Sequence, residues 1–127
     1  MDRRQFVKYT GAVAGSSAVA TLGVAPAFAQ SELKVAVMLP QSGPAGLFGP
    51  SSKACAELAA ETLNAKGGVL GRKVSLLFGD AGLPPAEASQ AALKLWKGSG
   101  AQAFIGMHDS AVRGALVGLF KAQVPYF

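Results

Sequence analysis

Three short apolar runs that alternate with helical patterns constrain the fold of this chain more than any other feature. The runs lie at residues 33–39, 73–80 and 101–106, and the first, LKVAVML, is almost continuously apolar and rich in valine. Such a run is typical of a strand covered on both faces, as in a parallel sheet. Because helices join the strands, right-handed crossovers place helices on both sides of that sheet. The sequence therefore predicts an α/β fold, a parallel sheet between helix layers.

The helical segments between these runs have recognisable ends. The first is expected to begin at Ser51 or Ser52, either of which can cap it, and to end near Lys66, before the glycine pair at 67–68. A second helix is expected over 85–97. The positions that form the apolar stripe of the first helix are Ala54, Leu58, Ala59, Thr62 and Leu63.

The last part of the chain continues the alternation. A third helix is expected after the polar segment at 106–110, and VPYF at 124–127 looks like the start of a fourth strand. Because the chain stops inside that strand, we expect it to be the leading fragment of a longer protein. The stripe of the third helix that should face the core consists of Val112, Ala115, Leu116, Leu119 and Phe120.

The N-terminus has the three parts of an export signal. A basic stretch with Arg3, Arg4 and Phe6 precedes a weakly apolar run at 11–25, and small residues before the end predict cleavage after Ala29. The arginine pair followed by phenylalanine resembles the twin-arginine type, although a general-secretory signal is a close competitor. A membrane anchor is less favoured, because the run contains glycines and serines and falls short of the roughly 20 strongly apolar residues of a stable span.

This signal divides the chain into two parts. Residues 1–29 are expected to be a twin-arginine-like signal peptide, read by the export machinery, and 30–127 the mature segment, which would reach the periplasm. Export leads to a compartment that permits disulfides, yet Cys55 is the one cysteine and cannot form one within the chain. Its alanine neighbours favour a buried position for it.

Composition argues against several classes of function. Of the 12 basic and 7 acidic residues, nine and six lie after the signal, where they are interspersed and form no dense basic stripe of the kind that binds nucleic acid. One histidine and scattered carboxylates supply no recognisable set of metal ligands. We therefore expect no metal, no cofactor and no nucleic-acid partner.

The segment GMHDS at 106–110 carries the polar groups that a site would use. Ligands of open parallel sheets gather at the carboxyl ends of the strands, so this segment and the glycine-rich loop at 40–51 should face one crevice. Either Ser110 or Asp109 can cap the following helix, and the N–H groups of a helix start attract a carboxylate or amide oxygen. Capping alone explains the serine equally well.

Catalysis is not expected at this segment, and a structural role or a contact with the ligand is the expected role of both His108 and Asp109. His108, Asp109 and Ser110 are neighbours in one turn, so their side chains point in different directions, and no G-x-S-x-G elbow surrounds the serine. The first loop reads G-x-x-G-x-x-G, not the G-x-G-x-x-G of a dinucleotide site. Asp80 either imitates the ribose-binding acid of such a site or starts a turn. We predict no catalytic residue and no enzymatic activity.

Residues 33–127 resemble the periplasmic solute-binding proteins of ABC transporters, in the branched-chain amino acid, amide and urea group. The most specific features are the SGP loop at 42–44, the passage LNAKGGVLGRKV at 63–74, and a strand-G-x-x-x-S-helix passage that ends at Ser110. The resemblance implies a two-lobed protein of the type 1 fold that closes on a small solute and hands it to a membrane permease. Residues 30–127 would then be an incomplete N-terminal lobe.

The resemblance also implies roles for individual residues. Ser110 would hold a carboxylate or amide oxygen of the solute, His108 would line the pocket, and Phe48 would pack on the ligand. The pair His108-Asp109 departs from the amino acid binders and favours an amide, urea or another polar solute. Two alternatives stay open: an exported nucleotide-dependent oxidoreductase with a Rossmann-like domain, and a sensory module of the same fold.

Overall fold

The central sheet determines how the rest of the chain is arranged. In the computed structural model, which describes residues 32–106 and 109–127, three parallel strands form one sheet in the order β2-β1-β3. β1 spans Leu33–Leu39, β2 spans Val74–Asp80 and β3 spans Ala103–Ile105. The three strands predicted from the apolar runs and their parallel pairing are confirmed.

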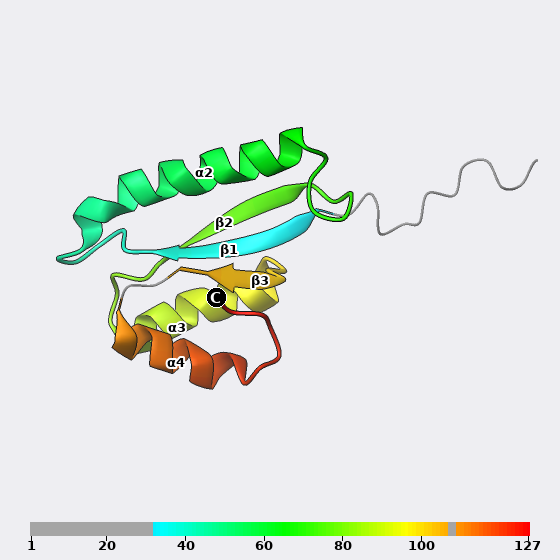
Figure 1. Ribbon diagram of the computed structural model, residues 1–127. Coiled ribbons are helices and arrows are strands. Elements are labelled where there is room, and N and C mark those ends of the chain that lie inside the picture. Colours follow the sequence, from blue (N-terminus) through cyan, green and yellow to red (C-terminus); the bar gives the residue numbers. More distant parts are fainter. Residues whose placement is uncertain (1–31, 107–108) are drawn as a thin grey trace, which may run out of the picture.

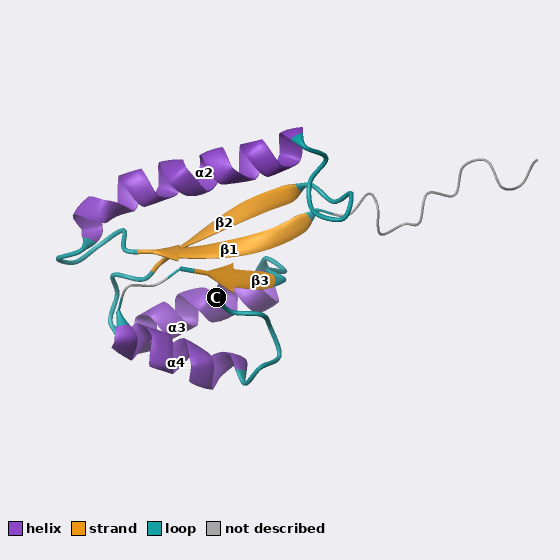
Figure 2. Ribbon diagram, in the orientation of Figure 1, coloured by secondary structure: helices purple, strands orange, loops and turns teal. Residues whose placement is uncertain are grey.

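The register brings the ends of the strands together. Leu39 pairs with Asp80 at the end of β1 and β2, and Val37 pairs with Ile105 at the end of β3. The loops that follow the strands therefore gather on one side of the molecule, at the left in Figure 2. We call this side the carboxyl edge and the opposite side the amino edge.

Helices cover both faces of the sheet. α2 (Gly49–Ala65) lies on one face, and α3 (Pro85–Leu93) and α4 (Ser110–Phe120) lie on the other (Figure 1). A short 3₁₀ turn, η2 (Gly46–Phe48), precedes α2, and a π-helical turn, η3 (Lys94–Gly98), continues α3. The second predicted helix is thus α-helical at first and π-helical in its last turn. The predicted α/β architecture, with the sheet between helix layers, is confirmed.

The start of α2 corrects the prediction that Ser51 or Ser52 would cap it. The helix begins at Gly49 with Pro50 in its first turn, and Phe48 occupies the cap position without a side-chain hydrogen bond to the helix. Proline suits this turn because its fixed φ is already helical and its missing N–H is not needed there. The Ser51 hydroxyl instead donates to the Phe48 carbonyl oxygen at 3.1 Å.

The stripe predicted for α2 lies on its outer side. Leu58 is 64% exposed, whereas Ala60, on the side that faces the sheet, is 8% exposed. Small inner residues let the helix lie close to the strands, so the leucine spacing indicated the wrong face. Cys55 is also exposed, which corrects its predicted burial. The exposed residues of the predicted stripe are Ala54, Leu58, Ala59, Thr62 and Leu63.

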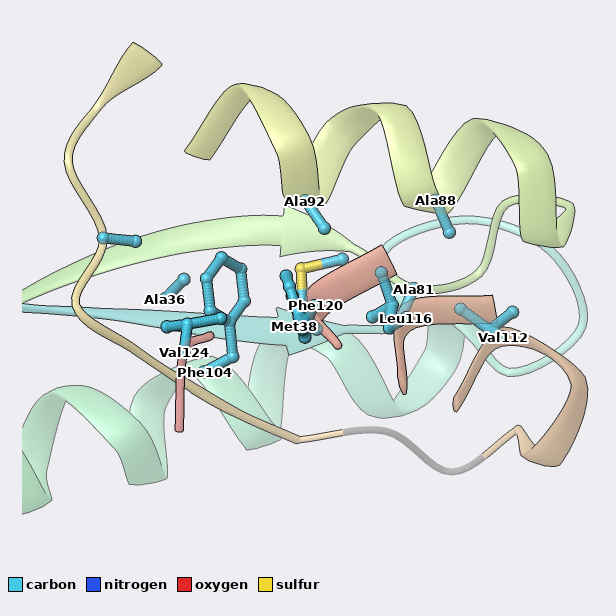
Figure 3. Packing of buried hydrophobic residues seen from close by; sticks show 11 residues of the cluster. Ala36, Met38, Ala81, Ala88, Ala92, Phe104, Val112, Leu116, Phe120 and Val124 are labelled. Carbon is cyan, nitrogen blue, oxygen red and sulfur yellow. The ribbon is translucent and has the colours of Figure 1, made fainter. Parts of the chain in front are cut away.

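The hydrophobic core lies between the sheet and the layer of α3 and α4 (Figure 3). Its largest fully buried side chains are Met38, Phe104, Leu116 and Phe120. The Phe120 ring centroid lies 4.5 Å from that of Phe104 and 5.7 Å from that of Trp96, so aromatic contacts join α4 to the sheet and to η3. The stripe predicted for α4 is confirmed, with Val112, Leu116 and Phe120 buried and Ala115 and Leu119 partly buried.

The final residues run beside β3 without forming a regular strand. The Phe104 N–H donates to the Pro125 oxygen at 2.9 Å, and the Phe127 N–H donates to the Phe104 oxygen at 3.0 Å. These bonds form one parallel bridge between Phe104 and Tyr126. The predicted start of a fourth strand is therefore present as a single bridge, on the side of β3 that faces away from β1.

Candidate functional site

The carboxyl edge contains a small cavity to which all three loops of this edge contribute. Its volume is about 180 Å³, and it lies between the β1–α2 loop, the β2–α3 loop and the start of α4. The first loop and the polar segment before α4 thus meet at this edge, as the parallel topology requires. The residues that line the cavity are Ser42, Pro44, Ala45, Ala81, Gly82, Leu83 and Asp109.

One carboxylate oxygen joins the first two of these loops. Asp80 Oδ1 accepts hydrogen bonds from the N–H groups of Gln41 at 2.9 Å, Ser42 at 3.3 Å and Gly82 at 2.7 Å. Burial by itself raises the pKa of Asp80, but hydrogen bonds from the Ser42 hydroxyl and these N–H groups outweigh it, and the pKa lies below its ordinary value of 3.8. Of the two roles that the sequence left open for Asp80, its contacts match the start of a turn.

Two glycines let the loops meet backbone to backbone. A Cβ atom on Gly82 would lie 2.0 Å from the Ser42 carbonyl oxygen, far inside van der Waals contact. Gly43 has a φ of +69°, and a Cβ atom there would lie 3.0 Å from the Gly82 oxygen. Larger residues at either position would push the two loops apart and change the shape of the cavity.

Asp109 is the residue that caps α4. Its Oδ1 atom accepts hydrogen bonds from the N–H groups of Ala111 at 2.8 Å and Val112 at 3.0 Å, and Ser110 is the first residue of the helix. Of the two capping residues that the sequence allowed, the structure has Asp109. Its carboxylate therefore engages two of the N–H groups that would otherwise attract an anion at this helix start.

Ser110 and Phe48 are both exposed, but neither lines the cavity. Within residues 32–106 and 109–127, the Ser110 hydroxyl makes no hydrogen bond, so it is available to a ligand. Phe48 is 57% exposed and ends η2. Its neighbour in the sequence, Gly49, lines a second hollow of about 310 Å³, together with Leu39, Gln41, Gly46, Pro50 and Lys53.

Several predicted residues lie outside the described part of the chain. They are His108 in the polar segment, Arg3, Arg4 and Phe6 in the signal, and Ala29 at the expected cleavage point. Their roles remain predictions from the sequence.

The described residues include no metal centre and no membrane span. No group of three or more histidine, cysteine, aspartate or glutamate residues within 32–106 and 109–127 is arranged to hold a metal ion. In the same ranges, no helix combines the length and the apolar character that crossing a bilayer demands.

Ser42, Gly82 and the loop-joining role of Asp80 were not predicted from the sequence. A recognisable signal was present, because Asp80 ends an apolar run and Gly82 follows in the D-x-G pattern of an Asx turn. What the sequence alone does not give is the strand order. Only when β2 lies beside β1 does Asp80 reach the loop at 41–42.

A family model and several relatives match this chain. The family model described as "Periplasmic binding protein" matches residues 32–127. Leu/Ile/Val-binding protein homolog 3 of Brucella melitensis is 36% identical over 93 residues, which is 73% of this chain and 25% of that protein. Leu/Ile/Val-binding protein homolog 7 of Brucella abortus is 45% identical over 69 residues, and the chain covers 17% of its length.

Solved structures are similar over the same region. LivJ of Streptococcus pneumoniae, a branched-chain amino acid transporter substrate-binding protein in complex with isoleucine, has a TM-score of 0.68 and 28% identity, over 76% of this chain and 28% of that chain. A solute-binding protein of an ABC transporter from R. palustris, in complex with benzoate, has a TM-score of 0.65 and 28% identity, over 76% of this chain and 26% of that chain. The chain therefore belongs to the periplasmic binding protein family, with the type 1 fold, and is similar to solute-binding proteins of the branched-chain amino acid transporter type.

Proposed function

We propose that the protein is the substrate-binding component of an ABC importer and binds a small polar solute reversibly in a cleft between two lobes. The observation that carries this proposal is the cavity at the carboxyl edge, where Ser42, Gly82 and Asp109 meet in a chain of this family. Residues 30–127 form part of the N-terminal lobe, the carboxyl edge forms one wall of the cleft, and the second lobe supplies the other.

Ser110 is the proposed anchor for the solute. Its exposed hydroxyl stands at the first position of α4, beside the capping carboxylate of Asp109. A hydroxyl can donate to an oxygen of the solute or accept from an N–H group, so it suits an amide as well as an acid. His108 selects the solute by hydrogen bonding and shape, and Phe48 covers it, as the resemblance of the sequence implies.

Asp109 biases the choice of solute. Its carboxylate occupies the helix start at which a carboxylate of the solute would otherwise bind. A second carboxylate placed beside it would be repelled by its negative charge. A neutral amide or urea avoids this repulsion, and the ammonium group of an amino acid is attracted. We therefore propose an amino acid, a short amide or urea as the solute. Of these, the charge of Asp109 favours an amide or urea.

The remaining parts of the proposal concern the route and the partners. A signal peptide at 1–29 directs the protein through the export machinery, by the twin-arginine route, to the periplasm, where the solute-loaded form docks on an ABC permease. Binding leaves the bonds of the solute intact, so the protein is not an enzyme. Family membership favours this solute-binding role over the oxidoreductase alternative.

A thermal-shift screen of the full-length gene product tests the proposal. The probes are isoleucine, acetamide, urea and benzoate, each followed by calorimetry where the unfolding temperature rises. We expect at least one amino acid or amide to stabilise the protein reversibly and to be recovered unchanged. Conversion of the bound compound into a product, or no stabilisation by any amino acid, amide or urea, would contradict it.

A further inference from the structure

We propose that Asp80 is a positioning residue for solute binding, because it holds the β1–α2 and β2–α3 loops together as one wall of the cavity. The inference rests on the proposed function for its link to a solute. It adds to that function a residue that does not itself touch the cavity but fixes two residues that do, Ser42 and Gly82.

The contacts of Asp80 are concentrated on backbone groups that have no place in the sheet. Gln41 and Ser42 belong to a loop in which prolines and glycines prevent a regular hydrogen-bond ladder, so their N–H groups need another acceptor. Asp80 supplies it with one oxygen, at 2.9 Å from Gln41 N and 3.3 Å from Ser42 N. The same oxygen accepts from Gly82 N at 2.7 Å and so starts the next loop.

The position of Asp80 in the sheet makes this bridge possible. Asp80 is the last residue of β2 and lies opposite Leu39, the last residue of β1. The Ala81 N–H continues the ladder by donating to the Leu39 oxygen at 2.7 Å, after which the two chains diverge. A carboxylate at this point reaches across the gap that opens beyond the ladder. Its charge strengthens each bond, because hydrogen bonds to an ionised acceptor are roughly twice as strong as neutral ones.

The geometry of the cavity depends on this bridge. Gly82 approaches the Ser42 carbonyl oxygen so closely that no side chain fits between the two loops. Both residues line the cavity, and Asp109 lines it from the start of α4. Without the Asp80 carboxylate, three N–H groups lose their acceptor and turn toward water, and the loops separate. Ser42 and Gly82 would then lose their fixed position relative to Asp109.

The test compares Asp80 with a residue that makes similar bonds far from the site. Asn64 donates from Nδ2 to the Val74 oxygen at 2.9 Å and accepts from Val74 N at 2.7 Å, at the amino edge of the sheet. Asp80→Ala and Asn64→Ala each remove a side chain that holds backbone groups, so both should lower the unfolding temperature. Only Asp80→Ala should weaken solute binding, by about tenfold or more at a temperature at which both variants are folded. Asp80→Asn keeps an oxygen acceptor and should recover part of the loss.

Two measurements on the full-length gene product, amide hydrogen exchange and solute affinity, test separately whether Asp80 joins the two loops and whether this contact matters for solute binding. Amide hydrogen exchange at Gln41, Ser42 and Gly82 needs no ligand and should quicken in Asp80→Ala but not in Asn64→Ala. Unchanged exchange at these amides would show that Asp80 does not hold the two loops together, whatever the protein binds. Faster exchange with unchanged affinity overturns the positioning role, as does an equal loss of affinity in both variants. If the wild-type protein binds no amino acid, amide or urea, the proposed function is contradicted, and so is the link between Asp80 and a solute. The exchange data would still show whether Asp80 holds the two loops together.

Discussion

The charged side chains that bind backbone groups at the two edges of the sheet have opposite signs. At the carboxyl edge, Asp80 and Asp109 accept hydrogen bonds from backbone N–H groups. At the amino edge, long cationic side chains donate to carbonyl oxygens. Lys34 Nζ donates to the Ser99 oxygen at 3.1 Å, and Arg72 Nη2 donates to the Glu32 oxygen at 2.8 Å.

The bonds of Asp109 and Lys34 follow from the polarity of a parallel α/β layer. Helices that run antiparallel to the strands begin at the carboxyl edge, where N–H groups are left over, and end at the amino edge, where carbonyl oxygens are left over. Asp109 and Lys34 bind such helix-end groups, whereas Asp80 binds N–H groups of the loops and Arg72 binds the carbonyl oxygen that precedes β1. The carboxyl edge also has a cavity, about 180 Å³, and its two carboxylates shape that cavity and the electrostatics a solute would meet.

The largest expected effect separates binding from stability at the carboxyl edge. Ser110→Ala removes an exposed hydroxyl that makes no hydrogen bond among the described residues, so the unfolding temperature should stay within error. Affinity for the identified solute should fall about fivefold to more than a hundredfold, because a lost buried hydrogen bond in the complex costs about 1–3 kcal/mol. Calorimetry on the full-length gene product measures both. Ser89→Ala, which removes a hydroxyl bound to the Pro85 oxygen on α3, is the control. Unchanged affinity in Ser110→Ala would defeat the role of the serine.

A smaller effect tests the charge at the same helix start. Asp109→Asn keeps a side chain that caps helices equally well, so stability should change little. Removal of the negative charge should improve binding of a carboxylate such as benzoate by about twofold to fivefold, since a charge at a helix start contributes on the order of 0.3–1 kcal/mol. Affinity for a neutral amide should stay the same. An equal change for acids and amides would show that Asp109 does not discriminate by charge.

The sequence predicted the layers of this fold well because they depend on local patterns. The continuous apolar run at 33–39 is buried on both faces of the sheet, and the stripe with Leu116 and Phe120 gives α4 one face to bury. For α2, the sequence pattern predicted the wrong inward face. Its leucines, Leu58 and Leu63, are both exposed, whereas the helix lies against the sheet through Ala60, and only tertiary packing decides which side is inward.

The candidate site was predictable in place but not in detail. Parallel strands place their loops at one edge, so the meeting of the first loop with Asp109 followed from topology. Whether Asp109 or Ser110 would cap α4 depended on backbone angles that the residue types do not determine, since both are good caps. The bridge of Asp80 depended on strand order, which three apolar runs leave open.

At the amino edge, removal of a donor should affect stability alone. Arg72→Met keeps much of the apolar stem but loses the bonds to the Glu32 oxygen and to Gln102 Oε1, at 2.8 and 2.7 Å. These bonds are exposed to solvent, so the free energy of unfolding should fall by only about 1 kcal/mol. Chemical denaturation measures this loss, and calorimetry should give an unchanged solute affinity. A fall in affinity as large as that of Asp80→Ala would break the functional distinction between the edges.

The smallest effect is a pH dependence that only the carboxyl edge should show. The pKa of Asp80 is lowered in the folded protein, so its bridge stabilises the fold fully above the ordinary value of 3.8 and is lost as the pH falls through the lower, folded value. Urea unfolding between pH 3 and 7 should therefore show a smaller loss of stability on acidification in Asp80→Asn than in the wild type, whereas Arg72→Met should follow the wild-type slope. Because Asp80 is only partly buried, solvent screens its charge and keeps this difference small. Identical slopes in Asp80→Asn and the wild type would mean that the proton on Asp80 does not control the bridge.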